Sequence, residues 1–157
     1  MGGTLHRLVD QGHEVTVAYL TSGCLAVPDA DAIKAAELIV DLAKFSNRED
    51  PPEAQLAQVT LDDLLDNNDF EIDTEKVRIL KGLIRRGEAK MACEVCGLPS
   101  QQVKFLDLPF YEKGKYRQFK LQNEDIELLR ELLLEFKPHQ LYATGACAEP
   151  STVQAVC

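Results

Sequence analysis

The side chains that could do chemistry in this chain are few, and the first candidates are cysteines. Cys93 and Cys96 have the C-x-x-C spacing that is found in redox dithiols and in half of a structural zinc site. Redox pairs sit at the N-terminus of a helix, where the helix dipole favours the thiolate, whereas this pair falls near the expected end of a helix. Cys147 and Cys157 are ten residues apart and make a poor second half of a zinc site. We therefore interpret Cys93 and Cys96 as small helix residues without a ligand role.

The histidines and the first two glycines also give no strong signal of a metal or phosphate site. His6, His13 and His139 form no H-x-x-x-H or H-x-H pattern, so the sequence patterns predict no metal site. Gly2-Gly3 precedes an expected helix, and helix N-terminal amides attract phosphate. Two glycines without the rest of a phosphate-binding fingerprint favour a tight backbone turn instead.

Two charged residues have both a structural and a functional interpretation. Arg85 and Glu88 would lie one turn apart on a helix, where an exposed ion pair contributes a few tenths of a kcal/mol. Alternatively, the Arg85 guanidinium binds a phosphate or a sugar hydroxyl of a ligand. Asp107 follows an expected strand and could orient a ligand or cap the next turn.

The elements that must position these residues alternate along the chain. Apolar spacing and stop signals predict helices over residues 4–11, 28–47, 73–96 and 123–137, and strands over residues 14–20, 102–108 and 139–145. The first strand is apolar on both faces, as strands sandwiched between helices are. This order predicts an α/β fold with a Rossmann-like parallel sheet, flanked by helices in three layers.

Ligands of such sheets bind at the carboxyl ends of the strands. In this chain those ends are Thr21-Ser22-Gly23, Asp107-Leu108-Pro109 and Thr144-Gly145-Ala146. The sequence therefore predicts the binding site at these three segments.

An acidic segment interrupts the alternation. Ten acidic residues and no Lys or Arg lie between Glu49 and Glu75, which predicts a solvated helical insertion at about residues 48–75. A short helical piece is expected from Thr60, with Asp63 completing a weak capping arrangement. The helix that follows is basic, with Lys76, Arg78, Lys81, Arg85, Arg86 and Lys90.

Composition limits the classes of function. A chain of 157 residues can bury about two-thirds of its surface, which predicts a single domain over residues 1–157. The formal charge of −9 disfavours nucleic acid and anionic membranes as partners. No apolar run approaches the ~20 residues of a membrane span, and the first residues lack the apolar core of a secretory signal. Five cysteines, an odd number, favour reduced thiols, and we predict a cytoplasmic location.

Several motifs coincide in their order along the chain. They are Gly2-Gly3-Thr4-Leu5, Gly12-His13-Glu14-Val15, Thr21-Ser22-Gly23, Arg85-x-x-Glu88-x-x-x-Ala92-x-x-x-Cys96-Gly97 and Phe105-Leu106-Asp107-Leu108-Pro109. Together they resemble the PIG-L (LmbE-like) family of zinc-dependent N-deacetylases, over nearly the whole chain. The segments 22–29 and 84–89 and the acidic insertion look closest to the PIG-L-like domain fused behind a sugar isomerase fold in some bacterial glucosamine-6-phosphate deaminases.

The resemblance implies a hydrolase that removes the acetyl group of an N-acetylglucosamine-type sugar, with zinc activating water and an aspartate as general base. In the family, a Pro-His-Pro-Asp-Asp segment just upstream of the glycine pair supplies a histidine ligand, an aspartate ligand and the base, and this chain begins at Met1, after that point. A further histidine ligand follows the strand that matches residues 139–144, and Ser151 and Gln154 stand at those histidine positions. Zinc is expected of intact family members, whereas no catalytic residue, metal ligand or cofactor is expected in this chain.

The preferred hypothesis is a catalytically silent, incomplete PIG-L-like domain of carbohydrate metabolism. It would bind an amino sugar or a sugar phosphate through Thr21, Ser22, Arg85 and Asp107. The sheet is expected to lack its first strand, and the exposed edge would pair with a second copy or be covered by a fused isomerase-type domain. The alternatives are a structural or assembly domain without a ligand, and an active zinc-dependent deacetylase when the full-length chain is present.

Overall fold

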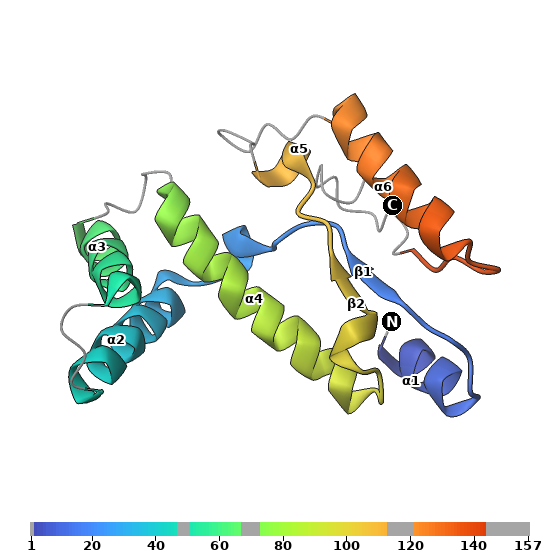
Figure 1. Ribbon diagram of the computed structural model, residues 1–157, viewed down its shortest axis with the longest axis horizontal. Coiled ribbons are helices and arrows are strands. Elements are labelled where there is room, and N and C mark those ends of the chain that lie inside the picture. Colours follow the sequence, from blue (N-terminus) through green and yellow to red (C-terminus); the bar gives the residue numbers. More distant parts are fainter. Residues whose placement is uncertain (1, 47–50, 67–72, 113–120, 144–157) are drawn as a thin grey trace. The chain divides into compact units, whose positions relative to one another are not determined.

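The computed structural model describes residues 2–46, 51–66, 73–112 and 121–143 (Figure 1). The chain forms two compact units, each described here by itself. The sheet unit comprises Met1–Ser22 and Ala92–Cys157, and the helical unit comprises Gly23–Met91. The expected single domain over residues 1–157 stays a prediction.

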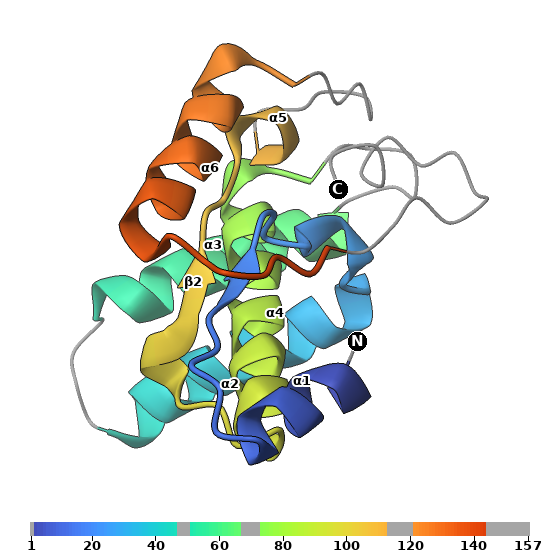
Figure 2. The same ribbon diagram turned by 90° about the vertical axis from the view of Figure 1, so that its right-hand side faces the viewer.

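The sheet unit is built around two parallel strands, β1 (Val17–Tyr19) and β2 (Val103–Phe105). They run side by side in both views (Figures 1 and 2), with Val17 opposite Val103 and Tyr19 opposite Phe105. The rings of Tyr19 and Phe105 stack with centroids 5.4 Å apart. These β-branched and aromatic residues suit a half-buried pleated surface, and the predicted parallel pairing is confirmed for these two strands.

The sheet unit also contains helices and a 3-10 turn. They are α1 (Gly2–Asp10), the end of α4 (Glu75–Val95), the 3-10 turn η2 (Ser100–Gln102), α5 (Pro109–Glu112) and α6 (Asn123–Phe136). The core consists of Cys93, Leu98 and Val103, against which Leu5 and Val9 of α1 pack together with β1 and β2. Apolar residues from segments far apart in the sequence therefore hold α1 and the end of α4 near the strands.

Glycines end two of these helices, as predicted. Gly12 follows α1 with a φ of 77°, and Gly97 follows α4 with a φ of 81°. In this left-handed region only glycine avoids a steric penalty, and the turn lets the N–H of Leu98 bond to the carbonyl of Cys93 at 2.9 Å.

The helical unit contains the 3-10 turn η1 (Cys24–Ala26), α2 (Asp29–Phe45), α3 (Pro52–Asp66) and the larger part of α4. α2 and α3 lie side by side (Figures 1 and 2). Ala32, Leu64 and Val77 form the buried core, with Ile33, Leu80 and Ile84 packed against them. The helical spacing of these residues explains why the predictions for α2 and α4 were accurate.

The acidic segment differs from its prediction. α3 begins at Pro52, eight residues before the expected start at Thr60, because proline at the first position of a helix costs no hydrogen bond. Thr60 is 2% exposed in the interior of α3, and its hydroxyl donates to the carbonyl of Leu56 at 2.7 Å. Asp63 does not cap this helix, since it accepts a hydrogen bond from Thr74 at 2.9 Å. The expectation of a wholly solvated insertion is therefore wrong for α3.

The C-terminal part of the structure also differs from its prediction. Residues 139–143, expected to begin a third strand, are exposed and form no strand, and residues 144–145 lie outside the described part. Within the described residues the sheet has two strands, so the three-layer arrangement and the missing first strand stay predictions. The N-cap of α6 is Gln122 and not Asn123.

The apolar stripes of two helices are covered only in part. Ile126 of α6 is 56% exposed, and Met91 and Val95 at the end of α4 are 66% and 80% exposed. Helical periodicity gives the spacing of an apolar stripe, but packing against a neighbour decides how far along a helix the stripe is covered.

Candidate functional site

The ends of β1 and β2 meet at one edge of the sheet. Beyond the strands, the N–H of Leu106 donates to the carbonyl of Tyr19, and the N–H of Leu108 donates to that of Leu20, both at 2.9 Å. Thr21 and Asp107 flank this last backbone contact in sequence. The structure therefore brings together two of the three predicted strand ends, and the third, at residues 144–146, lies outside the described part.

Asp107 occupies the turn that leaves β2. Its φ of 46° is in the left-handed region, which aspartate tolerates better than most residues. The side chain is half-buried and its Oδ1 atom is shielded from solvent. The turn leads directly into α5, which begins at Pro109. Capping of the next turn and a role toward a ligand both stay predictions for Asp107.

The backbone of Ser22 is held by a residue that the sequence analysis missed. Its N–H donates to Oε1 of Glu112 at 3.0 Å, and Glu112 is the last residue of α5. No helix is predicted between residues 108 and 123. Pro109, a residue favoured at the first position of a helix, was the signal that could have located α5.

A second carboxylate ties α5 to α6. Asp125 is 1% exposed, and it accepts hydrogen bonds from the N–H of Phe110 at 2.8 Å and from the N–H of Gln122 at 2.7 Å. The Gln122 side chain in turn caps the N–H of Asp125, which completes a capping box. An acidic residue in the first turn of a helix is favoured by the helix dipole alone, so its sequence position does not reveal the contact with Phe110.

Arg85 belongs to the helical unit. Its guanidinium forms an ion pair with Glu88, and the two side chains are 46% and 55% exposed, so the pair stabilises the fold by well under about 1 kcal/mol. The same side chain lies against Gly23, where an added Cβ would be 3.5 Å from Nε. The predicted ion pair is confirmed, and a role of Arg85 in binding stays a prediction.

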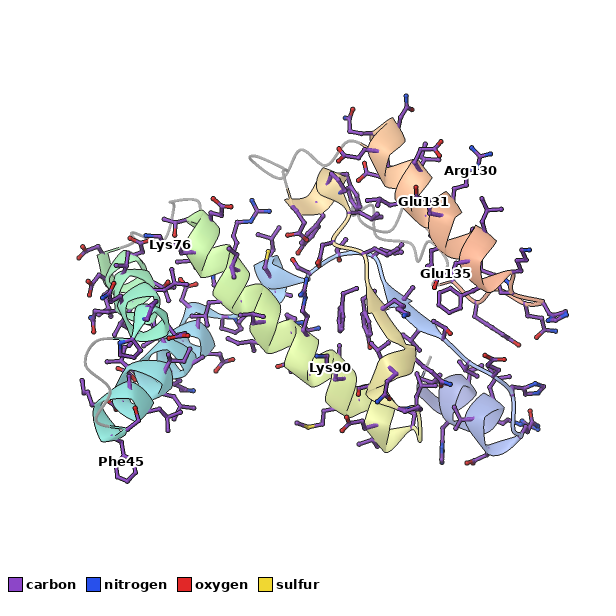
Figure 3. All side chains as sticks on the ribbon, viewed as in Figure 1. Phe45, Lys76, Lys90, Arg130, Glu131 and Glu135 are labelled. Atoms are coloured by element: carbon purple, nitrogen blue, oxygen red, sulfur yellow. The ribbon has the colours of Figure 1, made fainter. Side chains whose placement is uncertain are left out.

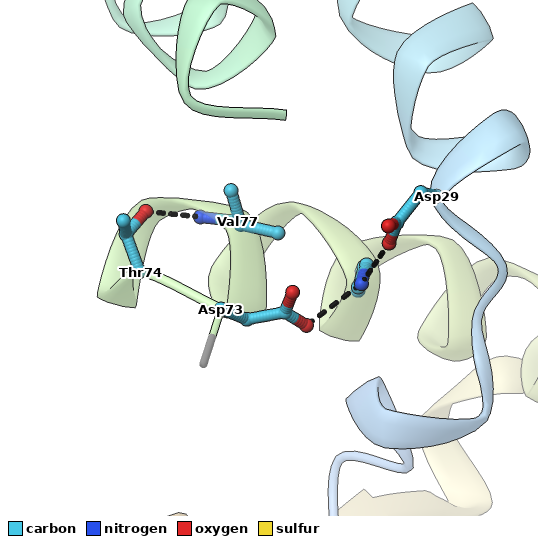
Figure 4. Close-up of polar contacts among 5 residues, drawn as sticks. Asp29, Asp73, Thr74 and Val77 are labelled. Carbon is cyan, nitrogen blue, oxygen red and sulfur yellow. Dashed lines mark hydrogen bonds and ion pairs between the residues drawn. The ribbon is translucent and has the colours of Figure 1, made fainter. Parts of the chain in front are cut away.

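Lys81 is a buried cation of the helical unit that pairs with two carboxylates, those of Asp29 and Asp73, which are labelled in Figure 4. Its side chain is 5% exposed, and Nζ lies 2.5 Å from Asp29 and 2.7 Å from Asp73. Burial lowers the pKa of Lys81, but hydrogen bonds and charge attraction from Asp29 and Asp73 outweigh it, so the pKa is raised above 10.5. Lys81 is thus a cation at neutral pH that joins the starts of α2 and α4.

The described residues do not fit the zinc that the resemblance implies. Within residues 2–46, 51–66, 73–112 and 121–143, no three His, Cys, Asp or Glu side chains are placed to hold a metal ion. Cys93 is buried, with Sγ 3.7 Å from the Tyr19 hydroxyl, and His6 lies beside Asp10 at 3.6 Å. Ser151 and Gln154 lie outside the described part.

Comparisons with known proteins agree with the motifs. The family model described as "PIG-L: GlcNAc-PI de-N-acetylase" matches residues 1–149. A relative from Bacteroides thetaiotaomicron, named "Putative glucosamine-6-phosphate deaminase-like protein", is 42% identical over 158 residues, which cover 100% of this chain and 24% of the relative. The chain thus spans about a quarter of the length of that relative. No solved structure matches, and no helix of the described residues has the length and apolar character of a membrane span. The chain belongs to the PIG-L family.

Proposed function

We propose that this chain is a deacetylase-related domain associated with glucosamine-6-phosphate metabolism, which binds an amino sugar or its phosphate at the strand ends and does not itself catalyse deacetylation. The observation that carries the proposal is the meeting of the β1 and β2 ends, with Thr21, Ser22 and Asp107 beside the contact between Leu108 and Leu20. Ligands of open α/β sheets bind at this edge.

The residue types at this edge suit a sugar. The hydroxyls of Thr21 and Ser22 can donate and accept hydrogen bonds, and the carboxylate of Asp107 can accept from sugar hydroxyls or from an ammonium group. Arg85 is the proposed contact for a phosphate, because a guanidinium binds phosphate oxygens in a bidentate manner. The name of the Bacteroides relative supports an amino-sugar phosphate as the ligand class.

The proposal of catalytic silence rests on the donor chemistry. PIG-L family members are generally zinc-dependent, and in such enzymes the metal polarises the carbonyl and activates water. Ser151 and Gln154 stand where the resemblance places histidines, and neither side chain is a usual zinc ligand. The role proposed for the residues of this chain is therefore to bind and orient the sugar, without a catalytic step.

Calorimetric titration with glucosamine 6-phosphate tests the site. We expect Asp107→Asn to weaken binding about tenfold, because a charge-assisted hydrogen bond is lost while asparagine still tolerates the left-handed backbone. Asp10→Asn is the matched control, since Asp10 is an exposed carboxylate at the end of α1. Equal affinity of the Asp107→Asn variant and the wild type would place the ligand elsewhere.

A second titration tests Arg85. Arg85→Ala is expected to weaken binding of glucosamine 6-phosphate about tenfold and to leave binding of N-acetylglucosamine unchanged, because only the former carries a phosphate. Arg130→Ala is the matched control, since Arg130 also pairs with a glutamate one turn away on a helix surface. Parallel losses for both sugars would contradict the assignment of Arg85 to the phosphate.

A second candidate function is assembly without a small-molecule ligand. The apolar side chains of Leu38, Leu42 and Phe45 are 61%, 57% and 90% exposed along α2, and Phe45 projects from its end (Figure 3). The partner would be a second copy or a fused isomerase-type domain, at this face or at the sheet edge. A Leu42→Glu variant that loses self-association, together with no sugar binding at millimolar concentration, would favour this function.

A further inference from the structure

Two carboxylates of the sheet unit accept backbone hydrogen bonds near the strand ends. Asp125 of α6 accepts the N–H of Phe110 at 2.8 Å, and Glu112 accepts the N–H of Ser22 at 3.0 Å. Phe110 and Glu112 both belong to α5, which has only four residues. The two carboxylates are therefore connected through a single helical turn.

We propose that Asp125 is a positioning residue for the strand-end site, which acts through α5 and Glu112 on the backbone of Ser22. As far as it concerns ligand binding, this inference rests on the proposed function. Asp125 does not touch the ligand in this account. It fixes the helical turn that carries Glu112, and Glu112 fixes the peptide of Ser22.

The physical basis is the instability of a single turn. Nucleation of a helix is unfavourable. In this single turn the N–H groups of Tyr111 and Glu112 both bond to the carbonyl of Leu108, whereas the N–H of Phe110 bonds to an acceptor on α6. The Asp125 carboxylate accepts the N–H of Phe110 with one oxygen at 2.8 Å, and its other oxygen accepts the N–H of Gln122 at 2.7 Å. Hydrogen bonds to a charged acceptor in a buried location are stronger than neutral ones, so this one side chain orders α5 against the start of α6.

A purely local role for Asp125 makes a different prediction. If the carboxylate only capped α6 and α5, its loss would affect the amides of Phe110 and Gln122 and leave Ser22 unchanged. Positioning predicts instead that the change reaches Ser22, the residue held by Glu112 at the far end of α5.

Amide hydrogen exchange of the full chain, measured by NMR, separates the two roles. We expect Glu112→Ala to accelerate exchange of the Ser22 amide about tenfold relative to the Leu106 amide, and Glu112→Gln, which keeps the acceptor oxygen, to restore it to within about twofold. Asp125→Asn is expected to accelerate the Ser22 amide by about threefold or more, because an amide cannot accept both N–H groups. Asp10→Asn is the control and leaves Ser22 unchanged.

The double variant provides the decisive comparison. Glu112→Ala with Asp125→Asn is expected to exchange at Ser22 no faster than Glu112→Ala alone, since both changes act along one route. Additive acceleration, or an Asp125→Asn variant that affects only Phe110 and Gln122, would overturn the inference. If the Asp125→Asn variant does not fold, hydrogen exchange of the wild type over a denaturant series replaces it. Equal opening free energies of the Ser22, Phe110 and Gln122 amides support positioning, and unequal, independent opening overturns it.

Titration of the same variants with glucosamine 6-phosphate adds the functional readout. Asp125→Asn and Glu112→Ala are expected to weaken binding about threefold to tenfold, and Glu112→Gln to restore it. If the wild type binds no sugar phosphate, the proposed function fails, while the exchange measurements still decide whether Asp125 positions Ser22. If the wild type binds and the Asp125→Asn variant binds equally well, positioning of the ligand site is overturned.

Discussion

At the scale of single residues, the polar contacts that matter most join positions far apart in the sequence. Lys81 lies 52 residues from Asp29, and Ser22 lies 90 residues from Glu112. Sequence spacing identifies only pairs within one helix, such as Arg85 with Glu88. This is why the ion pair of Arg85 could be predicted, whereas the roles of Glu112, Asp125 and Lys81 could not.

Replacement of Lys81 tests the buried ion-pair cluster. Lys81→Met is expected to lower the free energy of unfolding by about 2–3 kcal/mol, because Asp29 and Asp73 would face each other without a cation. Chemical denaturation under reducing conditions measures the change. Lys76→Met, at the exposed start of α4 (Figure 3), is the control. An equal loss of unfolding free energy in the two variants would show that the buried ion pairs of Lys81 do not stabilise the fold.

The raised pKa of Lys81 also predicts a dependence on pH. The folded chain holds this proton more tightly than the unfolded chain does, so the contribution is complete below the ordinary lysine value of 10.5 and is lost as the pH rises through the raised value. The stability difference between the wild type and Lys81→Met is therefore expected to be constant over about pH 7–9 and to shrink above about pH 10.5. A difference that grows at alkaline pH would contradict this sign.

At the scale of elements, local rules predicted where helices run better than where they begin. The apolar spacing of Ala36 and Val40 in α2, and of Val77 and Leu80 in α4, located both helices. The expected start of α3 at Thr60 is wrong because α3 begins at Pro52, and proline is favoured at the first helical position. Strands were predicted longer than observed, since apolar character marks a buried segment and hydrogen bonding to a neighbour decides where the strand ends.

The end of α4 offers a prediction at this scale. A Cβ at residue 97 would lie 3.2 Å from Cγ1 of Val9, at a φ of 81°. Gly97→Ala is therefore expected to lower the free energy of unfolding by about 1–2 kcal/mol. Gly87→Ala, in the interior of α4 with open space around the added methyl group, is the matched control and is expected to raise stability by about 0.5–1 kcal/mol. A change in unfolding free energy of the same sign for both variants would contradict this explanation of the helix end.

At the scale of the whole molecule, the motif pattern was more informative than periodicity. The motifs around Thr21-Ser22-Gly23 and Phe105-Leu106-Asp107 predicted the family, which the match over residues 1–149 confirms. The meeting strand ends were predicted separately, from the apolar strands and the rule that ligands of open α/β sheets bind at the carboxyl ends of the strands. Residues 139–143 of the expected third strand form no strand, and residues 144–157, which include Ser151, lie outside the described part of the chain.

The metal content of the purified chain is a prediction at this scale. We expect no stoichiometric zinc after dialysis and no acetate release from N-acetylglucosamine in the presence of added zinc, because serine and glutamine stand at the implied histidine positions. Elemental analysis and an acetate assay measure the two quantities. Tight one-to-one zinc would require a site built from residues such as Cys93, Cys96 and Cys147, and the chain would then be a metalloprotein.

The most direct test of the central claim is an NMR titration of the isotope-labelled chain with glucosamine 6-phosphate. The account predicts saturable shift changes at the backbone amides of Thr21, Ser22, Asp107 and Leu108, at the edge where β1 and β2 end. It also predicts a shift at the Arg85 side chain. No shifts at millimolar ligand, or shifts confined to residues away from this edge, would contradict it.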